Sequence, residues 1–264
     1  MKGEQKMAIQ AFYFSPTHTT EQITLHISDK MAEILSLKVE KNSLTKPAER
    51  AKDYALTNSD ILVLGLPVYG GRIPLLLEQT LKGMKGENTP AVLVTVYGNR
   101  DFDDALLEMK DLLSANGFKV VAAGAFIGEH SFSKKLAADR PDGQDMEIAT
   151  DFAQRCAKKL IEKDFGKLIV KGHHPYKERN PNAPVAPKTK DSCNRCMICY
   201  NACPTQAISS EDPKIADQDK CIKCCACVKS CPLGAKYFDA EMMLKSTAWL
   251  ETNFMDRKEP EFFL

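Results

Sequence analysis

The sequence contains the stretch CNRCMICYNACP at residues 193–204 and repeats its pattern as CIKCCACVKSCP at residues 221–232. Each stretch has the spacing C-x2-C-x2-C-x3-C-P, and together they hold nine of the ten cysteines of the 264-residue chain. Cysteines that staple a small secreted domain are spread across its loops, and the first residues show no small-residue cleavage site of the kind that accompanies export. The pattern therefore predicts a reduced, cytoplasmic, metal-binding segment.

This spacing favours two [4Fe–4S] clusters with crossed ligands. Two-residue gaps let one turning loop direct three thiolates at a compact cube, and the fourth cysteine of each run ligates the other cluster. Zinc also takes Cys-x2-Cys pairs and is the competing metal, but it gives no reason for two identical runs of four. One predicted ligand set is Cys193, Cys196, Cys199 and Cys231, and the other is Cys221, Cys224, Cys227 and Cys203.

Two cysteines fall outside these sets. We expect Cys225, next to Cys224, to be a small apolar side chain in a tight loop, with a replacement ligand as the alternative. Cys156 lies four residues after Phe152 and four before Leu160, so we place it on the buried face of a helix.

The first 165 residues alternate short apolar runs with longer amphipathic segments. Near-continuous apolar runs suit strands that are buried on both faces of a parallel sheet, whereas apolar spacings of three and four predict helices. The strands are expected at Ala8–Phe14, Leu37–Val39, Ile61–Val68, Ala91–Val96 and Val120–Phe126. The helices are expected at Thr19–Leu35, Leu75–Leu81, Phe102–Leu113 and Met146–Ile161. This alternation predicts a doubly wound α/β sheet.

A polar loop, FSPTHTT at residues 14–20, joins the first strand to the first helix. Hydroxyl groups and free amides at such a turn form a cradle for a phosphate at a helix N-terminus. The loop has no Lys or Arg, which favours a monoester phosphate such as that of FMN. An ordinary helix N-cap is the alternative interpretation of the same residues.

Two further loops, LPVYGGRIP at residues 66–74 and YGNRD at residues 97–101, follow the third and fourth predicted strands. Open α/β sheets bind ligands at the carboxyl ends of their strands. Each loop supplies an aromatic ring for stacking and a glycine that permits close backbone approach. The three loops together therefore indicate a flavin site.

The pattern Ser15-x-Thr17-x-x-Thr20 resembles the S/T-x-T-G-x-T phosphate loop of flavodoxins, and the two later loops resemble the pair that brackets the flavin in that family. With the C-terminal cysteine runs, nearly the whole chain resembles the flavodoxin–ferredoxin fusion proteins known mainly from anaerobic bacteria and archaea. The resemblance implies a five-stranded parallel sheet of order 2-1-3-4-5, FMN, and a small α+β ferredoxin-like domain with two [4Fe–4S] clusters.

The resemblance also implies roles for individual residues. Tyr69 and Tyr97 would flank the flavin ring, and Gly70 or Gly71 would lie near its N5 atom. The phosphate would be held by Ser15, Thr17, Thr19 and Thr20, with His18 beside them, and the other two loops would add Pro67, Val68, Gly98 and Asn99 to the FMN site.

His18 stands where flavodoxins usually have glycine. A positive φ there is tolerable, because histidine is among the residues enriched in the left-handed region. Its ring then either donates to the phosphate or points to solvent, and the sequence leaves both open. The loop at Gly128–Phe132 either covers the flavin edge or is an ordinary surface loop.

The sequence divides into residues 1–165 (flavodoxin-like, FMN-binding), 166–190 (linker), 191–238 (ferredoxin-like) and 239–264 (a helical tail that clasps the modules together). We expect the proline-containing linker to be an extended, solvated tether, and its basic side chains indicate no nucleic-acid binding. Between residues 167 and 190 the only acidic residue is Glu178, whereas the basic residues are Lys167, Lys171, Lys177, Arg179, Lys188 and Lys190. No apolar run reaches the length of about 18 residues that a membrane span needs.

These features predict an electron-transfer protein that passes electrons between FMN, two [4Fe–4S] clusters and external redox proteins. One alternative is an FMN- and iron–sulfur-dependent oxidoreductase that reduces a small acceptor at the flavin. Another is an iron–sulfur protein whose flavodoxin-like domain has lost its flavin. The sequence leaves the partners, the potentials and the oligomeric state open.

Overall fold

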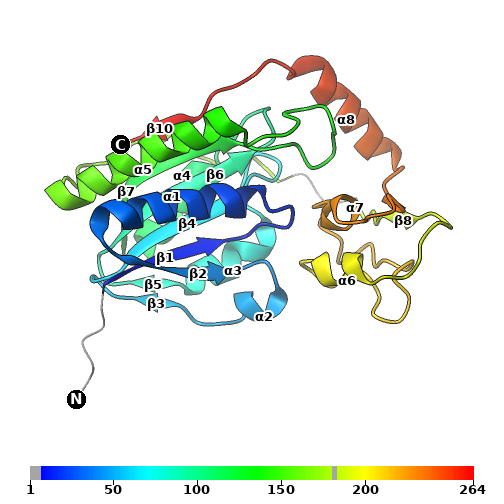
Figure 1. The fold of residues 1–264 in the computed structure, drawn as a ribbon, viewed down its shortest axis with the longest axis horizontal. Coiled ribbons are helices and arrows are strands. Elements are labelled where there is room, and N and C mark those ends of the chain that lie inside the picture. The colour runs from blue at the N-terminus through cyan, green and yellow to red at the C-terminus, as the bar shows by residue number, and fades with distance from the viewer. Residues whose placement is uncertain (1–6, 180–182) are drawn as a thin grey trace.

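The computed structural model describes residues 7–179 and 183–264 (Figure 1). Five parallel strands run in the order β2-β1-β4-β6-β7, which confirms the predicted order 2-1-3-4-5. Val, Ile, Leu and Ala fill β4, β6 and β7 because both faces of the sheet are covered there, whereas β2 is polar and has no buried residue. Their bounds are β1 (Ala8–Tyr13), β2 (Lys38–Ser43), β4 (Ile61–Pro67), β6 (Thr89–Tyr97) and β7 (Phe118–Ile127).

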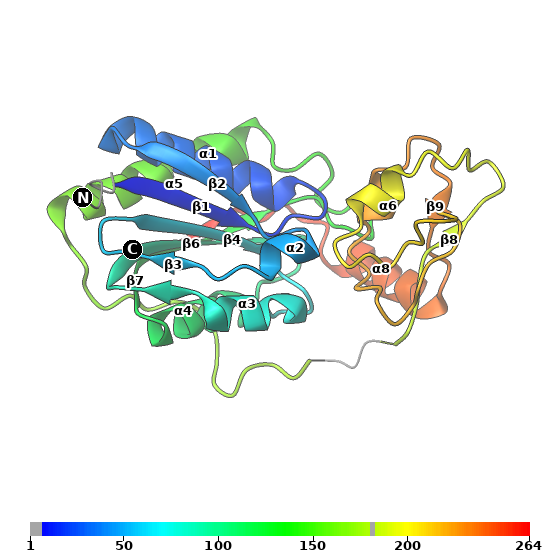
Figure 2. The ribbon, with the colours of Figure 1, turned by 90° about the horizontal axis from the view of Figure 1, so that it is seen from below.

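Helices cover the sheet on both faces (Figure 2). On one face α1 (Thr19–Leu35) and α5 (Gly143–Glu162) pack Ile27 and Phe152 into one hydrophobic core. On the other face the 3-10 turn η1 (Leu75–Leu77), α3 (Glu78–Gly83) and α4 (Ala105–Ala115) contribute to the second core. Cys156 is fully buried on α5, as predicted. The short α2 (Pro47–Arg50) and the two-stranded sheet of β3 (Ala55–Leu56) and β5 (Lys85–Gly86) complete this part.

The tail differs from the helix expected over residues 239–264. Its helix α8 spans Glu241–Asn253, and the chain then returns to the sheet as β10 (Glu261–Phe263), antiparallel to β7. Successive side chains of a strand point to opposite faces of the sheet, and this explains β10. Phe262 joins the core beneath α5, and Phe263 joins the core on the opposite face. The sheet therefore has a sixth strand, which pairs the otherwise open edge of β7.

The segment before the cysteine runs also differs from the predicted solvated tether. Leu168 and Val170 are buried in the core that includes α4. Beyond them, basic groups pair with acidic side chains of the first domain, including Lys171 with Asp101 and Arg179 with Glu108. The clustered positive charges thus neutralise a local acidic surface, which is why this stretch lies along the domain.

The remaining elements form the C-terminal module. The antiparallel strands β8 (Lys188–Thr189) and β9 (Lys236–Tyr237) join its two ends. Between them lie α6 (Ile198–Ala202) and α7 (Ala226–Lys229), one after each cysteine loop. In both views this module lies beyond the carboxyl ends of the parallel strands (Figures 1 and 2).

We expect Phe262→Ala to lower the free energy of unfolding by about 2–3 kcal/mol, because this partly buried ring stacks on two core aromatics. Its ring centroid lies 4.8 Å from that of Phe152 and 5.7 Å from that of Phe126. The matched control Leu264→Ala truncates the next apolar side chain of the tail, which is largely exposed. Urea unfolding followed by far-UV circular dichroism checks the difference, and equal losses in both variants would contradict the packing of β10.

Candidate metal and flavin sites

The two cysteine runs fold into two copies of one backbone conformation. Arg195 and Met197 adopt positive φ in the first run, and Lys223 and Cys225 do so 28 positions later in the second. Alternation between left- and right-handed conformations turns successive N–H groups toward one concave side, and such nests hold anions and iron–sulfur clusters. Cys225 is therefore the counterpart of Met197 at the start of its helix, and it is buried.

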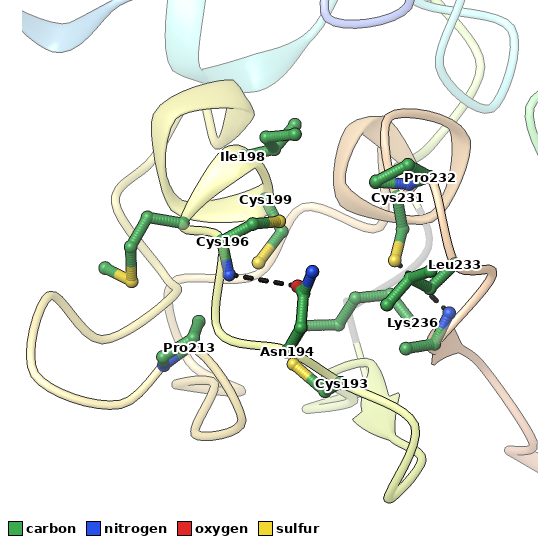
Figure 3. Close-up of a pocket in the computed structure, with 12 residues that line it drawn as sticks. Cys193, Asn194, Cys196, Ile198, Cys199, Pro213, Cys231, Pro232, Leu233 and Lys236 are labelled. Atoms are coloured by element: carbon green, nitrogen blue, oxygen red, sulfur yellow. Dashed lines mark hydrogen bonds between the residues drawn. The ribbon is translucent and has the colours of Figure 1, made fainter.

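The eight cysteines gather around two pockets, one of which is shown in Figure 3. The cysteines that line the outer pocket are Cys193, Cys196, Cys199 and Cys231. The inner pocket is lined by Cys203, Cys221, Cys224 and Cys227, with Cys225 beside them. This grouping is the one that the crossed-ligand rule predicts, because each pocket takes its fourth cysteine from the opposite run.

The donor groups suit iron–sulfur clusters. The fourth cysteines of the two runs receive backbone N–H bonds, from Ala207 to the Cys203 sulfur and from Ala235 to the Cys231 sulfur, each 3.2 Å long. Burial acts to raise the pKa of Cys231, but backbone N–H groups outweigh it and hold that pKa below its ordinary value. Cluster ligation requires thiolates, so such donors favour the ligating form. In residues 7–179 and 183–264 no group of three or more Cys, His, Asp or Glu side chains is arranged to hold a single metal ion.

The candidate phosphate loop, residues 14–20, forms a turn stabilised by Ser15. Its hydroxyl accepts a 3.0 Å bond from the Glu21 amide, and its own amide donates to the Thr45 hydroxyl. His18 adopts a φ of 68°, as anticipated for a position where glycine is usual. It is the N-cap residue of α1, but its side chain makes no capping hydrogen bond to the helix backbone. The His18 ring is 85% exposed and bonds Glu21 at 2.9 Å, so it faces solvent rather than the turn. The other hydroxyls of this loop are those of Thr17, Thr19 and Thr20.

The second loop, which follows Pro67 and Val68, makes a tight turn from Tyr69 to Arg72. Gly70 and Gly71 both have positive φ, and a Cβ at Gly71 would lie 2.1 Å from a carboxylate oxygen of Asp103. Gly70 has open space beside it, which leaves its backbone free to approach a ligand. Tyr69 is partly buried against the core.

The third loop places its residues differently from the prediction. Tyr97 is 4% exposed and packs on Phe102 with ring centroids 5.6 Å apart, so its ring belongs to the core and does not support stacking on a flavin. A Cβ at Gly98 would lie 2.3 Å from the His130 ring, which shows how closely the loop at 128–132 covers this one.

Asn99 retains an unused acceptor. Its side-chain N–H₂ donates to the carbonyls of Phe254 and Asp256 in the tail, at 2.6 and 2.8 Å. Its Oδ1 is buried without a hydrogen-bond partner among the described residues. A buried acceptor in this state is costly, and a donor such as a flavin N–H group would satisfy it. Together with the open face of Gly70, this is the feature of the loops that best fits FMN.

The inner pocket meets the first domain at the edge where these loops lie. Burial and nearby thiols raise the pKa of Tyr69 well above its ordinary value, and those thiols belong to Cys224, Cys225 and Cys221. Ile222 packs against the same core as Tyr69.

Three polar contacts, none of which the sequence revealed, join the same surfaces. Arg50 donates a 2.8 Å bond to the Pro204 carbonyl, and it also bonds the Leu44 and Thr45 carbonyls behind the phosphate loop. Lys46 donates to the Asn201 carbonyl, and Lys229 pairs with Glu129. No motif marks these side chains, because their partners are backbone carbonyls or distant residues.

One family of known proteins matches the C-terminal module. The family described as 4Fe-4S binding domain matches residues 186–209 and 215–237, one segment for each cysteine run. No curated protein matches the sequence.

Among solved structures, the chain is similar to a flavodoxin from Streptococcus pneumonia TIGR4, at 20% identity over 58% of this chain and 99% of that one, with a TM-score of 0.41. It is also similar to flavodoxin 2 from Bacillus cereus (20% identity, 58% and 99% covered, TM-score 0.42) and to Megasphaera elsdenii flavodoxin (16% identity, 57% and 98% covered, TM-score 0.37).

In the described part of the chain no helix is both long and apolar enough to cross a membrane. The combination of domains supports a redox role in electron transfer. The chain joins an N-terminal α/β domain with the flavodoxin-like strand order to a C-terminal 4Fe–4S binding domain.

Proposed function

We propose that this protein is an electron carrier in which FMN and two [4Fe–4S] clusters form one conducting path to external redox proteins. FMN exchanges electrons singly or in pairs whereas each cluster exchanges them one at a time, so their combination links two-electron and one-electron partners. The chain's own residues bind these groups, set the distances between them and exclude water from the path between them.

The approach of the inner cysteine loop to the core around Tyr69 carries this proposal. Tyr69 follows β4 in the loop that would bracket the flavin, and its phenol lies near the thiols of Cys221, Cys224 and Cys225. Tyr69 thus belongs to a candidate flavin loop and lies within electrostatic range of the inner thiols. Ile222, within the inner cysteine loop, packs against the same core as Tyr69, which supports a dry, fixed junction between the two modules.

The exposure of the cysteines supports a direction for the path. Cys203, Cys224 and Cys227 of the inner pocket are buried, and that pocket faces the loops of the first domain. Cys196 of the outer pocket is exposed. An external partner would therefore exchange electrons at the outer cluster, and the inner cluster would stand between it and the flavin.

The candidate flavin loops supply the remaining support. Gly70 offers backbone without an obstructing side chain, and Asn99 offers a buried acceptor to a ring N–H group. The phosphate would lie against the N-terminus of α1, beside Thr17, Thr19 and Thr20, where the helix dipole favours an anion.

Anaerobic purification with iron, sulfide and flavin analysis tests the proposal directly. We expect about eight iron atoms, about eight sulfides and about one FMN per chain, since two clusters of four irons and one flavin site are proposed. Zinc in place of iron, or iron without acid-labile sulfide, would refute the clusters. Clusters without flavin would restrict the path to the C-terminal module.

A pair of serine variants tests the crossed ligands. Cys203→Ser should damage the cluster whose other ligands are Cys221, Cys224 and Cys227, and iron content should fall by up to half. The matched control Cys225→Ser changes a cysteine that lines the same pocket but occupies the position of Met197, so this variant should keep its iron. Iron analysis with EPR of the reduced protein distinguishes the two. Loss of a cluster in the Cys225 variant would overturn the ligand assignment.

The folded protein should lose stability in acid because of His130. Burial, followed by the charges of Lys229 and Arg100, lowers the pKa of His130 to about 4. An unfolded histidine titrates near 6.5, so below that pH the unfolded state binds the extra proton and the folded state loses stability.

Between about pH 6.5 and about pH 5, wild type should therefore lose about 1–2 kcal/mol more stability than His130→Gln. Anaerobic urea unfolding at several pH values measures both slopes. Parallel slopes for the two proteins would show that His130 does not remain neutral in the folded state.

A further inference from the structure

The two cysteine pockets are built from equivalent residues. Apart from Pro213 in the outer pocket, and Pro187 and Phe238 in the inner one, every lining residue has a counterpart 28 positions away in the other pocket. Even the bonds from Ala207 to Cys203 and from Ala235 to Cys231 have the same length, 3.2 Å. Residues that match in this way would act alike on the two clusters, so a difference in reduction potential has to come from the residues that do not match or from the greater exposure of the outer cysteines.

One pair of counterparts differs in charge. Ile208 lines the inner pocket, and at the equivalent position of the outer pocket stands Lys236 (Figure 3). Both are buried, at 2% and 3% exposure. Ile208 packs in the small apolar core of the module, whereas Lys236 brings a side chain with a potential positive charge into the same position of the other half.

The Lys236 amine has no hydrogen-bond partner among the described residues, and its nitrogen is inaccessible to solvent. A buried ammonium without a counter-charge is strongly unfavourable, so it requires negative charge nearby. Burial raises the pKa of Cys199 of the outer set, and the positive charge of Lys236 is the largest influence in the opposite direction on that thiol. Lys236 also acts on Cys227 of the inner set, where its influence ranks behind those of Cys224 and Cys221. The nearby groups able to carry negative charge are thus cluster ligands.

We infer that Lys236 is a positioning residue that sets the outer cluster at a higher reduction potential than the inner one. This inference rests on the proposed clusters. A cluster with four thiolates is net negative and gains one more negative charge when reduced, so a fixed ammonium stabilises the reduced form. The desolvated position strengthens this effect, because water does not screen it. The electron would thus favour the outer, exposed end of the path.

The test is an EPR-monitored redox titration of four proteins purified anaerobically: wild type, Lys236→Ile, Lys236→Arg and Lys188→Ile. Lys236→Ile installs the residue that the inner pocket has at this position. The higher of the two reduction potentials should then fall by at least about 59 mV, which corresponds to a tenfold change in the equilibrium constant of reduction. The difference between the potentials of the two clusters should narrow accordingly. Lys236→Arg keeps the charge and should keep the gap.

Lys188→Ile is the matched control, since Lys188 lies on the strand paired with that of Lys236 but is 63% exposed and paired with Asp239. It should leave both potentials unchanged. An unchanged gap in Lys236→Ile, or a gap that narrows equally in Lys188→Ile, would overturn the inference.

Iron and sulfide content separates the possible failures. Wild type without clusters would refute the proposed function itself. If Lys236→Ile loses its clusters while Lys236→Arg retains them with the wild-type gap, the requirement for charge is upheld. If Lys236→Arg loses its clusters as well, the position requires the size and shape of lysine rather than its charge, and the electrostatic role is rejected.

Discussion

At the carboxyl edge of the sheet, Ile222 of the inner cysteine loop packs against the same core as Tyr69, and the arrangement of the two modules depends on this contact. Burial raises the pKa of Tyr69, and the thiols of Cys221, Cys224 and Cys225 lie close enough to raise it further. Parallel strands end at one edge, so the loops after β1, β4 and β6 meet there. The inner cysteine pocket lies against that same edge. Arg50, which bonds both the segment behind the phosphate loop and Pro204, makes a second connection across the junction.

Two segments that return to the first domain hold the junction in place. The stretch before the cysteine runs buries Leu168 and Val170, and the tail adds β10 to the sheet. The C-terminal module is therefore tied to the first domain on both sides, which limits its freedom to move away. Asn99 bonds the returning tail with its amide nitrogen, so the tail also closes over a candidate flavin loop.

The sequence predicted best where local patterns carry the information. Apolar runs revealed the five parallel strands, and the bounds of the first helix, Thr19–Leu35, agree with the structure. The spacing of the cysteines anticipated which thiols surround each pocket, because a short loop leaves few ways to arrange them. The left-handed conformation of His18 followed from its place in a motif that favours glycine.

Features that depend on distant partners were missed. Tyr97 looked like a stacking residue, but Phe102 and the covering tail place it in the core. The strand at Glu261–Phe263 forms because β7 has an unpaired edge, which no local pattern records. No sequence motif marks Lys236, because its burial depends on how the C-terminal module packs.

The central claim is that flavin and clusters exchange electrons within one chain. Rapid photochemical reduction of the clusters, followed by flavin absorbance at several protein concentrations, tests it most directly. We expect flavin reduction to follow with a rate constant independent of protein concentration, because the junction at Tyr69 is intramolecular. A rate that rises in proportion to concentration would contradict it, since electrons would then pass only between separate molecules.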